Sequence, residues 1–219
     1  MAVTHRIYVV DDHPLLRRGY RSLLESQPDL RVCGEAGSVK EALAEVSELE
    51  PDLVIADIAL GESSGLDLVR RLHGRRPELP ILVVSMHAEV LYAERALRAG
   101  ARGYLTKGET DADLVETVRK LLAGGHHLTP RMQARAIEQM TGKAAAPGLP
   151  AESALTDREL EVYELLGRGF STREVSDALR ISPKTVETYR GRIKDKLGLS
   201  DSTELLHRAV RYAQDRGLV

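Results

Sequence analysis

The stretch "DLVIADIALGESSG", residues 52–65, decides the fold. Its apolar run over 53–56 includes β-branched residues and is followed directly by an acid, Asp57. Such a run predicts a strand that is buried on both faces of a parallel sheet. An ionised carboxylate at the end of a buried strand is costly unless other groups compensate its charge. The stretch therefore predicts a buried strand and, at its end, a site that compensates Asp57.

Four further apolar runs recur along the first part of the chain. They are "RIYVV" (6–10), "RVCGEA" (31–36), "ILVVS" (81–85) and "GYLT" (103–106). Amphipathic segments separate the runs, and several open with helix-start signals, at His13-Pro14, at Ser38 with Glu41 and at Thr110 with Asp113. This alternation predicts an α/β fold of the (βα)5 type, in which right-handed crossovers join parallel strands into a doubly wound sheet.

Composition limits the classes of protein that the chain can belong to. With 219 residues, of which 42% are apolar, it has room for one large or two small domains. The single cysteine, Cys33, excludes an internal disulfide. No apolar run approaches the roughly 20 residues of a membrane span, and the N-terminus lacks the apolar core of a signal peptide. We therefore expect a soluble, cytoplasmic protein with no membrane partner.

A linker divides the chain. Residues 141–153, "TGKAAAPGLPAES", consist largely of small residues, proline and glycine, which cannot sustain a packed element. We predict a first domain over 1–127 and a second over 153–219. The intervening segment 128–152 is expected to hold a short helix over 129–140 and then the linker.

Polar residues follow the ends of several predicted strands. Asp11 and Asp12 follow the first strand, Asp57 ends the third, Ser85 ends the fourth and Lys107 follows the fifth. The carboxyl ends of parallel strands meet at one edge of a sheet, where doubly wound folds bind their ligands. Three carboxylates at this edge repel one another unless a divalent cation and an ammonium group neutralise them. The sequence therefore predicts a Mg²⁺ site, because Mg²⁺ prefers carboxylate, water and phosphate oxygens.

Each of these residues alone has a simpler interpretation. Asp11 and Asp12 before a helix-starting proline are also typical of a helix cap, and Asp57 is also typical of a turn. A lone Lys107 is typical of a solvated surface charge. Their joint position at one sheet edge favours the site.

The constellation resembles the receiver domain of two-component response regulators, over residues 5 to about 124. The resemblance implies that Asp57 accepts a phosphoryl group from a sensor histidine kinase. It implies that Mg²⁺ is bound by Asp12, by Asp57 and by the backbone carbonyl of Ala59, and by Asp11 mainly through a metal-bound water. It further implies that Lys107 pairs with the phosphoryl oxygens, that Ser85 hydrogen-bonds the phosphoryl group and that Tyr104 is the aromatic switch residue.

The loop after Asp57 departs from the family pattern. Where receivers usually carry Met-Pro, this chain has Leu60-Gly61. Since glycine does not restrict φ as proline does, we expect a looser loop here.

The second domain is predicted to be all-α with four helices. Thr156 with Glu159 and Ser171 with Glu174 are capping-box signatures. A third helix opens with Ser182-Pro183 and ends at Gly198, and a last one runs over about 201–214. The short turn before Ser182 predicts a helix-turn-helix. The helix after this turn carries the basic cluster, because residues 180–196 hold six basic residues against two acidic ones.

Residues from Leu155 to about Tyr212 resemble the LuxR-type DNA-binding domain, and the two domains in this order resemble the NarL/FixJ class of response regulators. The resemblance implies a DNA-binding set of Lys184, Thr185, Glu187, Thr188, Tyr189, Arg190, Gly191 and Lys194. Within it, Lys184, Glu187 and Thr188 would read base edges, Gly191 would permit close approach, and Tyr189, Arg190 and Lys194 would contact phosphates. Alternatively, Glu187 only pairs with Arg190 or Arg192.

The last helix carries apolar residues at helical spacing, more than a capping helix needs to bury in its own domain. The resemblance makes Leu205, Leu206, Ala209 and Tyr212 a dimer contact. A two-fold pair would read two half-sites about one helical turn apart.

We therefore predict a transcription regulator, not an enzyme, in which phosphorylation of Asp57 by a histidine kinase controls homodimerisation and binding to double-stranded DNA. One alternative is a DNA-binding dimer that is independent of phosphorylation. Another is a Mg²⁺-dependent aspartyl phosphatase, but such an enzyme needs a second acid two residues after the nucleophile, where this chain has Ala59.

Overall fold

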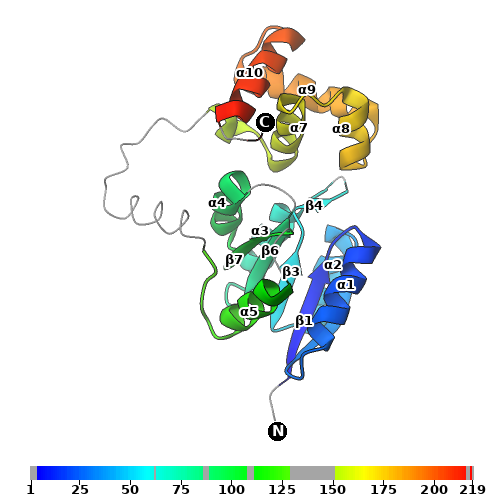
Figure 1. Cartoon of the computed structure of the whole chain (residues 1–219), viewed down its shortest axis with the longest axis vertical. Helices are drawn as coiled ribbons and strands as arrows, with labels where there is room; N and C mark the ends of the chain where they lie inside the picture. The colour runs from blue at the N-terminus through cyan, green and yellow to red at the C-terminus, as the bar shows by residue number, and fades with distance from the viewer. Residues whose placement is uncertain are drawn as a thin grey trace, which may run out of the picture. The chain divides into compact units, whose positions relative to one another are not determined.

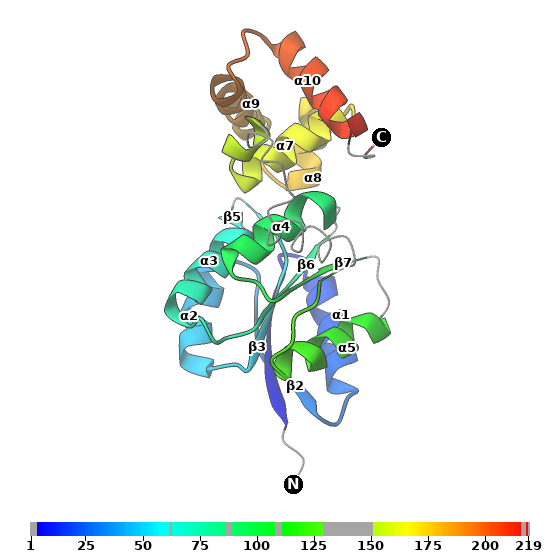
Figure 2. The same ribbon diagram turned by 90° about the vertical axis from the view of Figure 1, so that its left-hand side faces the viewer.

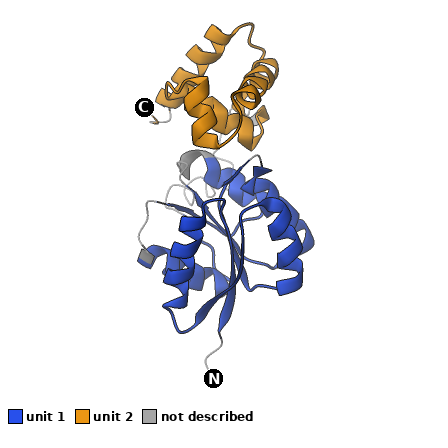
Figure 3. Cartoon of the chain, turned by 90° about the vertical axis from the view of Figure 1, so that its right-hand side faces the viewer, with its two compact units in different colours: residues 1–140 blue, residues 141–219 orange. Residues whose placement is uncertain are grey.

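The computed structural model describes residues 4–61, 63–85, 89–107, 111–128, 151–215 and 218. It divides into two compact units, residues 1–140 and residues 141–219 (Figure 3). The helix predicted over 129–140 and the linker up to 150 lie outside the described residues. The predicted boundaries at 127 and 153 stay predictions.

The first unit is built on a five-stranded parallel sheet (Figure 1). Its strands are β1 (His5–Val10), β2 (Leu30–Ala36), β3 (Leu53–Ala56), β6 (Ile81–Ser85) and β7 (Gly103–Thr106), and their order is β2-β1-β3-β6-β7. The chain adds β2 on one side of β1 and all later strands on the other, so the strand order reverses between β1 and β3. The predicted doubly wound sheet is confirmed.

Among the described residues of this unit, five helices cover the two faces of the sheet. They are α1 (Pro14–Glu25), α2 (Val39–Leu49), α3 (Gly65–Arg75), α4 (Glu89–Ala99) and α5 (Asp111–Leu122). Helices α1 and α5 lie on one face, and α2 and α3 lie on the other (Figure 2). Side chains of β1 alternate between the two layers, because Ile7 and Val9 join the core under α1 and α5, whereas the Tyr8 hydroxyl donates to Glu45 of α2.

Helix starts in this unit follow the sequence signals. Helix α1 begins at Pro14, directly after His13. Helix α2 begins after Ser38, whose side chain accepts a hydrogen bond from the backbone N–H of Glu41. Thr110, which was predicted to start α5, lies outside the described residues.

The loop after Asp57 forms a short antiparallel hairpin of β4 (Ala59–Leu60) and β5 (Ser63–Ser64). Gly61 follows β4 with φ of +59°, a left-handed conformation that proline cannot adopt. The hairpin was not predicted from the sequence, and the expectation of a looser loop stays a prediction. Glycine in place of proline supplies the backbone conformation that allows the chain to turn back and pair with itself.

The second unit contains four α-helices among its described residues. A 3₁₀ turn η1 (Ala151–Ala154) precedes α7 (Asp157–Gly167), α8 (Thr172–Leu179), α9 (Pro183–Leu197) and α10 (Ser202–Asp215). Both predicted capping boxes form, at Thr156 with Glu159 and at Ser171 with Glu174. Ser182 caps α9, and Gly198 ends it with φ of +65°.

Buried side chains hold the helix-turn-helix together. Val186, Ile193 and Leu197 of α9 are buried, as their spacing predicts. Arg158 of α7 donates a 3.0 Å hydrogen bond to the carbonyl of Leu179, the last residue of α8. This contact ties the turn between α8 and α9 to the first helix of the unit.

Helix α10 packs much of its apolar face within its own unit. Leu205, Ala209 and Tyr212 are buried, and the ring centroids of Tyr212 and Tyr163 of α7 lie 5.2 Å apart. Leu206 remains 42% exposed. From the sequence we expected α10 to carry more apolar surface than its own unit buries. These three side chains are buried in the unit, so they are not part of any such surplus. The dimer contact stays a prediction, and Leu206 is the exposed member of the predicted set.

No helix in the part of the chain that the structure describes is long and apolar enough to cross a membrane.

Candidate functional site

Backbone hydrogen bonds place the predicted site residues at one edge of the sheet. The N–H of Asp11 donates to the carbonyl of Ala36, and that of Asp57 donates to the carbonyl of Val10. The N–H of Lys107 donates to the carbonyl of Ser85. Each bond continues the pattern between neighbouring strands beyond their carboxyl ends. The sequence prediction that these residues meet at this edge is therefore correct in its geometry.

Lys107 links two of the carboxylates. Its Nζ lies 2.7 Å from Oδ2 of Asp11 and 2.7 Å from Oδ2 of Asp57. The exposed fractions of the three side chains are 5%, 1% and 4%, in the order Lys107, Asp11 and Asp57. Hydrogen bonds between ionised groups away from water are strong, so this lysine fixes the positions of both acids.

The surroundings of Asp57 raise its pKa from 3.8 to about 6. The largest cause is burial, which disfavours the charged carboxylate, and the negative charge of Asp11 acts in the same direction. The charge and hydrogen bond of Lys107 and the backbone N–H of Ala59 lower the pKa but do not outweigh burial. Burial also disfavours the charged form of Lys107, yet the two carboxylates hold its pKa above the ordinary value.

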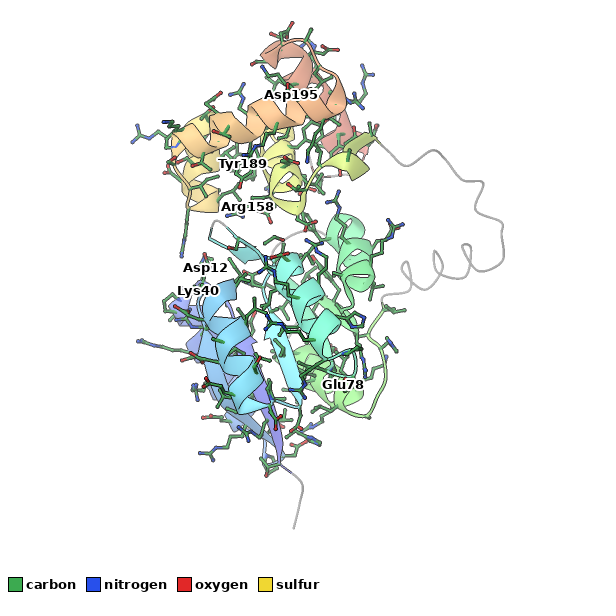
Figure 4. All side chains as sticks on the ribbon, turned by 180° about the vertical axis from the view of Figure 1, so that it is seen from behind. Asp12, Lys40, Glu78, Arg158, Tyr189 and Asp195 are labelled. Atoms are coloured by element: carbon green, nitrogen blue, oxygen red, sulfur yellow. The ribbon has the colours of Figure 1, made fainter. Side chains whose placement is uncertain are left out.

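Asp12 and His13 complete the cluster. Ligand atoms of Asp11, Asp12, His13 and Asp57 all lie within 4.8 Å of one another. Nδ1 of His13 lies 2.6 Å from Oδ1 of Asp12 and 3.2 Å from Oδ1 of Asp11. Figure 4 labels Asp12, which directly follows Asp11 beyond the end of β1.

The donor set fits a divalent cation. Three ionised carboxylates and one ammonium group leave two negative charges, which one divalent ion compensates. Carboxylate oxygens are hard donors of the kind that Mg²⁺ selects. The convergence of three such groups within 4.8 Å therefore agrees with the predicted Mg²⁺ site.

Two neighbouring residues were missed by the sequence analysis. His13 was used only as a helix-start signal, although its place beside two acids could have indicated a role. Arg17 of α1 donates a 2.6 Å hydrogen bond from Nη1 to the backbone carbonyl of Asp11. No sequence signal marks this contact, because it depends on how α1 packs against the loop.

The remaining receiver residues lie where the strands require. Ser85, at the end of β6, is fully buried, and Tyr104 of β7 is 1% exposed. The register of these strands pairs Val83 with Tyr104 and Ser85 with Thr106. Ser85 therefore lies at the edge with the acids, and the Tyr104 ring is directed into the protein.

Gly65 fixes the approach of α3 to the site. Its N–H donates a 2.7 Å hydrogen bond to the carbonyl of Ile58. A Cβ atom on Gly65 would lie 1.8 Å from the backbone oxygen of Asp57. Only glycine allows the start of α3 to come this close to the acid.

The second unit presents the predicted nucleic-acid interface on α9. Lys184, Glu187 and Thr188 are exposed, and Gly191 lies one turn further along the same face. Thr185, Tyr189, Arg190 and Lys194 are partly exposed on this helix. Figure 4 labels Tyr189 and Asp195 along α9, and the Arg192 guanidinium lies 6.0 Å from the centre of the Tyr189 ring.

Comparison with known proteins identifies both units. Residues 7–119 match the family described as the response regulator receiver domain, and residues 153–209 match the bacterial regulatory proteins of the luxR family. The chain belongs to the LuxR-type response regulators. The family predicted for this regulator, with its receiver and its helix-turn-helix domain, is thereby confirmed.

Relatives and solved structures agree with this assignment. The regulator is 35% identical over 209 residues to the response regulator GacA of Pseudomonas viridiflava, a match that covers 94% of this chain and 96% of GacA. It is 40% identical over 205 residues to the transcriptional activator protein ExaE of Pseudomonas putida, covering 93% of this chain and 95% of ExaE.

A crystal structure shows the same kind of protein. A LuxR-family two-component response regulator from Aurantimonas sp. SI85-9A1 aligns with 63% of this chain and 99% of its own, at 36% identity and a TM-score of 0.58.

Proposed function

We propose that this regulator takes a phosphoryl group on Asp57 from a sensor histidine kinase and that phosphorylation controls its dimerisation and its binding to promoter DNA. The observation that carries the proposal is the buried arrangement of Lys107 between Asp11 and Asp57, with both distances at 2.7 Å. The family assignment supplies the link between such a site and transcription.

The geometry supports phosphoryl transfer to Asp57. A carboxylate oxygen of Asp57 forms a bond to phosphorus while the bond between phosphorus and the histidine nitrogen of the kinase breaks. The pKa of Asp57 is about 6, so at pH 7 roughly nine-tenths of the molecules carry the nucleophilic carboxylate. Lys107 is already oriented to pair with a phosphoryl oxygen, so little reorganisation is needed during transfer.

Asp12, Asp57 and the carbonyl of Ala59 are proposed to hold Mg²⁺, with Asp11 acting mainly through a water. The ion would neutralise charge on the phosphoryl oxygens as they approach three carboxylates. Lys107, which also donates to Asp11, holds Asp57 in place, and the Ala59 N–H hydrogen-bonds its carboxylate.

The switch is proposed to pass through Ser85 and Tyr104. Ser85 lies at the same sheet edge as Asp57, so its hydroxyl can bond a phosphoryl group there. Movement of Ser85 would draw the buried Tyr104 ring with it, because the two strands that carry them are neighbours. Phosphorylation would then shift the equilibrium between two conformations. The size of this shift depends on the difference in free energy between the phosphoryl group's interactions in the two conformations.

In the DNA-binding unit, Lys184 and Thr188 are proposed to read base edges, and Tyr189, Arg190 and Lys194 to contact phosphates, with Thr185 at the same surface. The predicted dimer helix α10 carries Leu205, Leu206, Ala209 and Tyr212, of which the exposed Leu206 is proposed to contact the partner while the three buried side chains anchor the helix in its own unit. The regulator is proposed to act in the cytoplasm and to have no enzymatic role of its own beyond receiving the phosphoryl group.

Labelling with acetyl phosphate tests this function. Wild type should become phosphorylated in Mg²⁺, form dimers in size-exclusion chromatography with light scattering, and bind promoter fragments more tightly. Asp57→Ala should show none of these responses. Equal DNA affinity and equal mass with and without phosphorylation would instead support a constitutive DNA-binding dimer.

A further inference from the structure

Three side chains form a closed hydrogen-bonded cluster between the two helices of the helix-turn-helix. Thr172 is the first residue of α8, and Glu187 and Arg190 stand one turn apart on α9. The Thr172 hydroxyl donates to Oε1 of Glu187 over 2.9 Å and accepts from Nη1 of Arg190 over 2.8 Å. Nη1 of Arg190 also donates to the same Oε1 over 3.1 Å.

This cluster restrains the guanidinium group of Arg190. The Arg190 side chain is 22% exposed, whereas that of Glu187 is 57% exposed. Rotation of the guanidinium away from α8 would break both hydrogen bonds made by Nη1. Thr172 is therefore a fixed point on a different helix that holds Arg190 in one orientation at the surface of α9.

The cluster also changes the interpretation of Glu187. A lone carboxylate on a surface that meets phosphates repels DNA, but here Arg190 compensates the charge. Oε1 of Glu187 already accepts from two donors, so the side chain is engaged with protein groups before any DNA binds. Through these contacts Glu187 orients Arg190, and Oε1 of its carboxylate accepts from these protein groups instead of from a base edge.

We infer that Thr172 and Glu187 are positioning residues that hold Arg190 for contact with a DNA phosphate, and that Glu187 does not read a base. The inference rests on the proposed DNA-binding function. It adds Thr172 to the residues that support DNA binding. It also assigns Glu187 to orienting Arg190 instead of to recognising a base.

A double-mutant cycle on the phosphorylated full-length protein tests the positioning role. Thr172→Val removes the hydroxyl without changing the charge, so binding to a promoter fragment should weaken several-fold, whereas Thr172→Ser should bind like wild type. In an Arg190→Gln background, Thr172→Val should have no further effect. Equal losses in both backgrounds would overturn the inference, because Thr172 would then act on DNA independently of Arg190.

A library of half-site variants tests the role of Glu187. Glu187→Gln should leave the order of preference among bases unchanged at every position, whatever its effect on overall affinity. A base reader would instead lose about tenfold or more discrimination at one position. That result would overturn the inference. For the Thr172→Val variant of the double-mutant cycle, the matched control is Thr203→Val, at an exposed threonine of α10, which should leave DNA binding unchanged.

A measurement without DNA separates this inference from the proposed function. In NMR of the DNA-free protein, rotation of the Arg190 guanidinium should be slower than that of the exposed Arg211, and Thr172→Val should make it faster. Equal rotation of Arg190 and Arg211 in wild type would overturn the cluster itself. Failure of wild type to bind any promoter DNA would overturn the proposed function and the role of Arg190, even if the NMR result holds.

Discussion

Lys107 donates a 2.7 Å hydrogen bond to Asp57, yet the pKa of Asp57 is raised to about 6. An exposed carboxylate beside an ammonium group normally has a lowered pKa. Here burial outweighs the ion pair, and the neighbouring Asp11 adds like charge. Without a bound cation, ionisation of Asp57 therefore lowers the stability of the folded protein.

The first prediction concerns the pH dependence of stability. In buffer with a chelator, the folded protein holds more protons on Asp57 than the unfolded chain between about pH 4 and pH 6, so the contribution of Asp57 to stability is lost as the pH rises through this range. Asp57→Asn should therefore be more stable than wild type at pH 7, by on the order of 3 kcal/mol for a shift of about two pKa units. Urea unfolding across this pH range should show the difference shrinking toward pH 4.

Asp201→Asn provides a control of opposite sign. Backbone N–H groups of Glu204 and Thr203 lower the pKa of Asp201, so its ionised form stabilises the fold. Wild type should exceed this variant in stability at pH 7, with the difference shrinking as the pH falls. A difference for Asp57→Asn that is the same at all pH values would contradict the assignment of its cause.

The second prediction concerns metal addition and removal. The proposed Mg²⁺ site exists only in the folded chain, so Mg²⁺ at a concentration 100 times its Kd should stabilise wild type by about 2.7 kcal/mol. Asp12→Ala should lose most of this gain, which thermal unfolding with and without EDTA measures. Asp67→Ala, at an acid that pairs with Arg71 of the same helix, should respond to Mg²⁺ like wild type. An undiminished Mg²⁺ response in Asp12→Ala would exclude Asp12 as a ligand.

The third prediction concerns the close approach of α3 to the site. Gly65→Ala places a Cβ 1.8 Å from the carbonyl oxygen of Asp57, so the backbone of the acid must shift. We expect a loss of at least about 2 kcal/mol in unfolding free energy and slower labelling by acetyl phosphate. Gly74→Ala in the same helix meets no atom within 4 Å and should leave labelling unchanged. Equal labelling of both variants would show that the position of Asp57 tolerates the shift.

The sheet and its site could be predicted because their causes are local. Strands buried on both faces need continuous apolar runs, and parallel strands end at one edge. The contact between Asp57 and Lys107, which are 50 residues apart, could therefore be predicted without knowledge of the tertiary packing. Helix starts at Ser38, Thr156 and Ser171 were predictable for the same reason, since a capping side chain accepts a hydrogen bond from the backbone N–H only three residues further along.

The features that could not be predicted depend on how the folded chain pairs and packs. The hairpin after Asp57 was not predicted, because the sequence does not show that Gly61 adopts a positive φ and that β4 pairs with β5. The amount of apolar surface that α10 leaves unburied was overestimated, because the number of its apolar residues alone does not reveal how much surface α7 offers them. The contact of Thr172 with Arg190 depends on how two helices cross, and no spacing in the sequence encodes it.

The last prediction separates stability from DNA binding at Gly191. This residue lies within α9, and a Cβ added there meets no atom within 4 Å. Gly191→Ala should therefore raise stability by about 1 kcal/mol, because alanine loses less backbone entropy in a helix. If α9 enters the major groove with this face, the added methyl group meets the DNA, and promoter affinity should fall at least about fivefold, as 1 kcal/mol of strain would give.

Fluorescence anisotropy with labelled promoter DNA and thermal unfolding of the same samples measure both effects. Gly19→Ala is the matched control, because Gly19 lies on the exposed side of α1 with no atom within 4 Å of an added Cβ. It should gain stability without any change in DNA affinity. A Gly191→Ala protein that is more stable and binds DNA like wild type would show that α9 does not approach DNA closely at this position, and the base-reading face would then have to be assigned elsewhere on the helix.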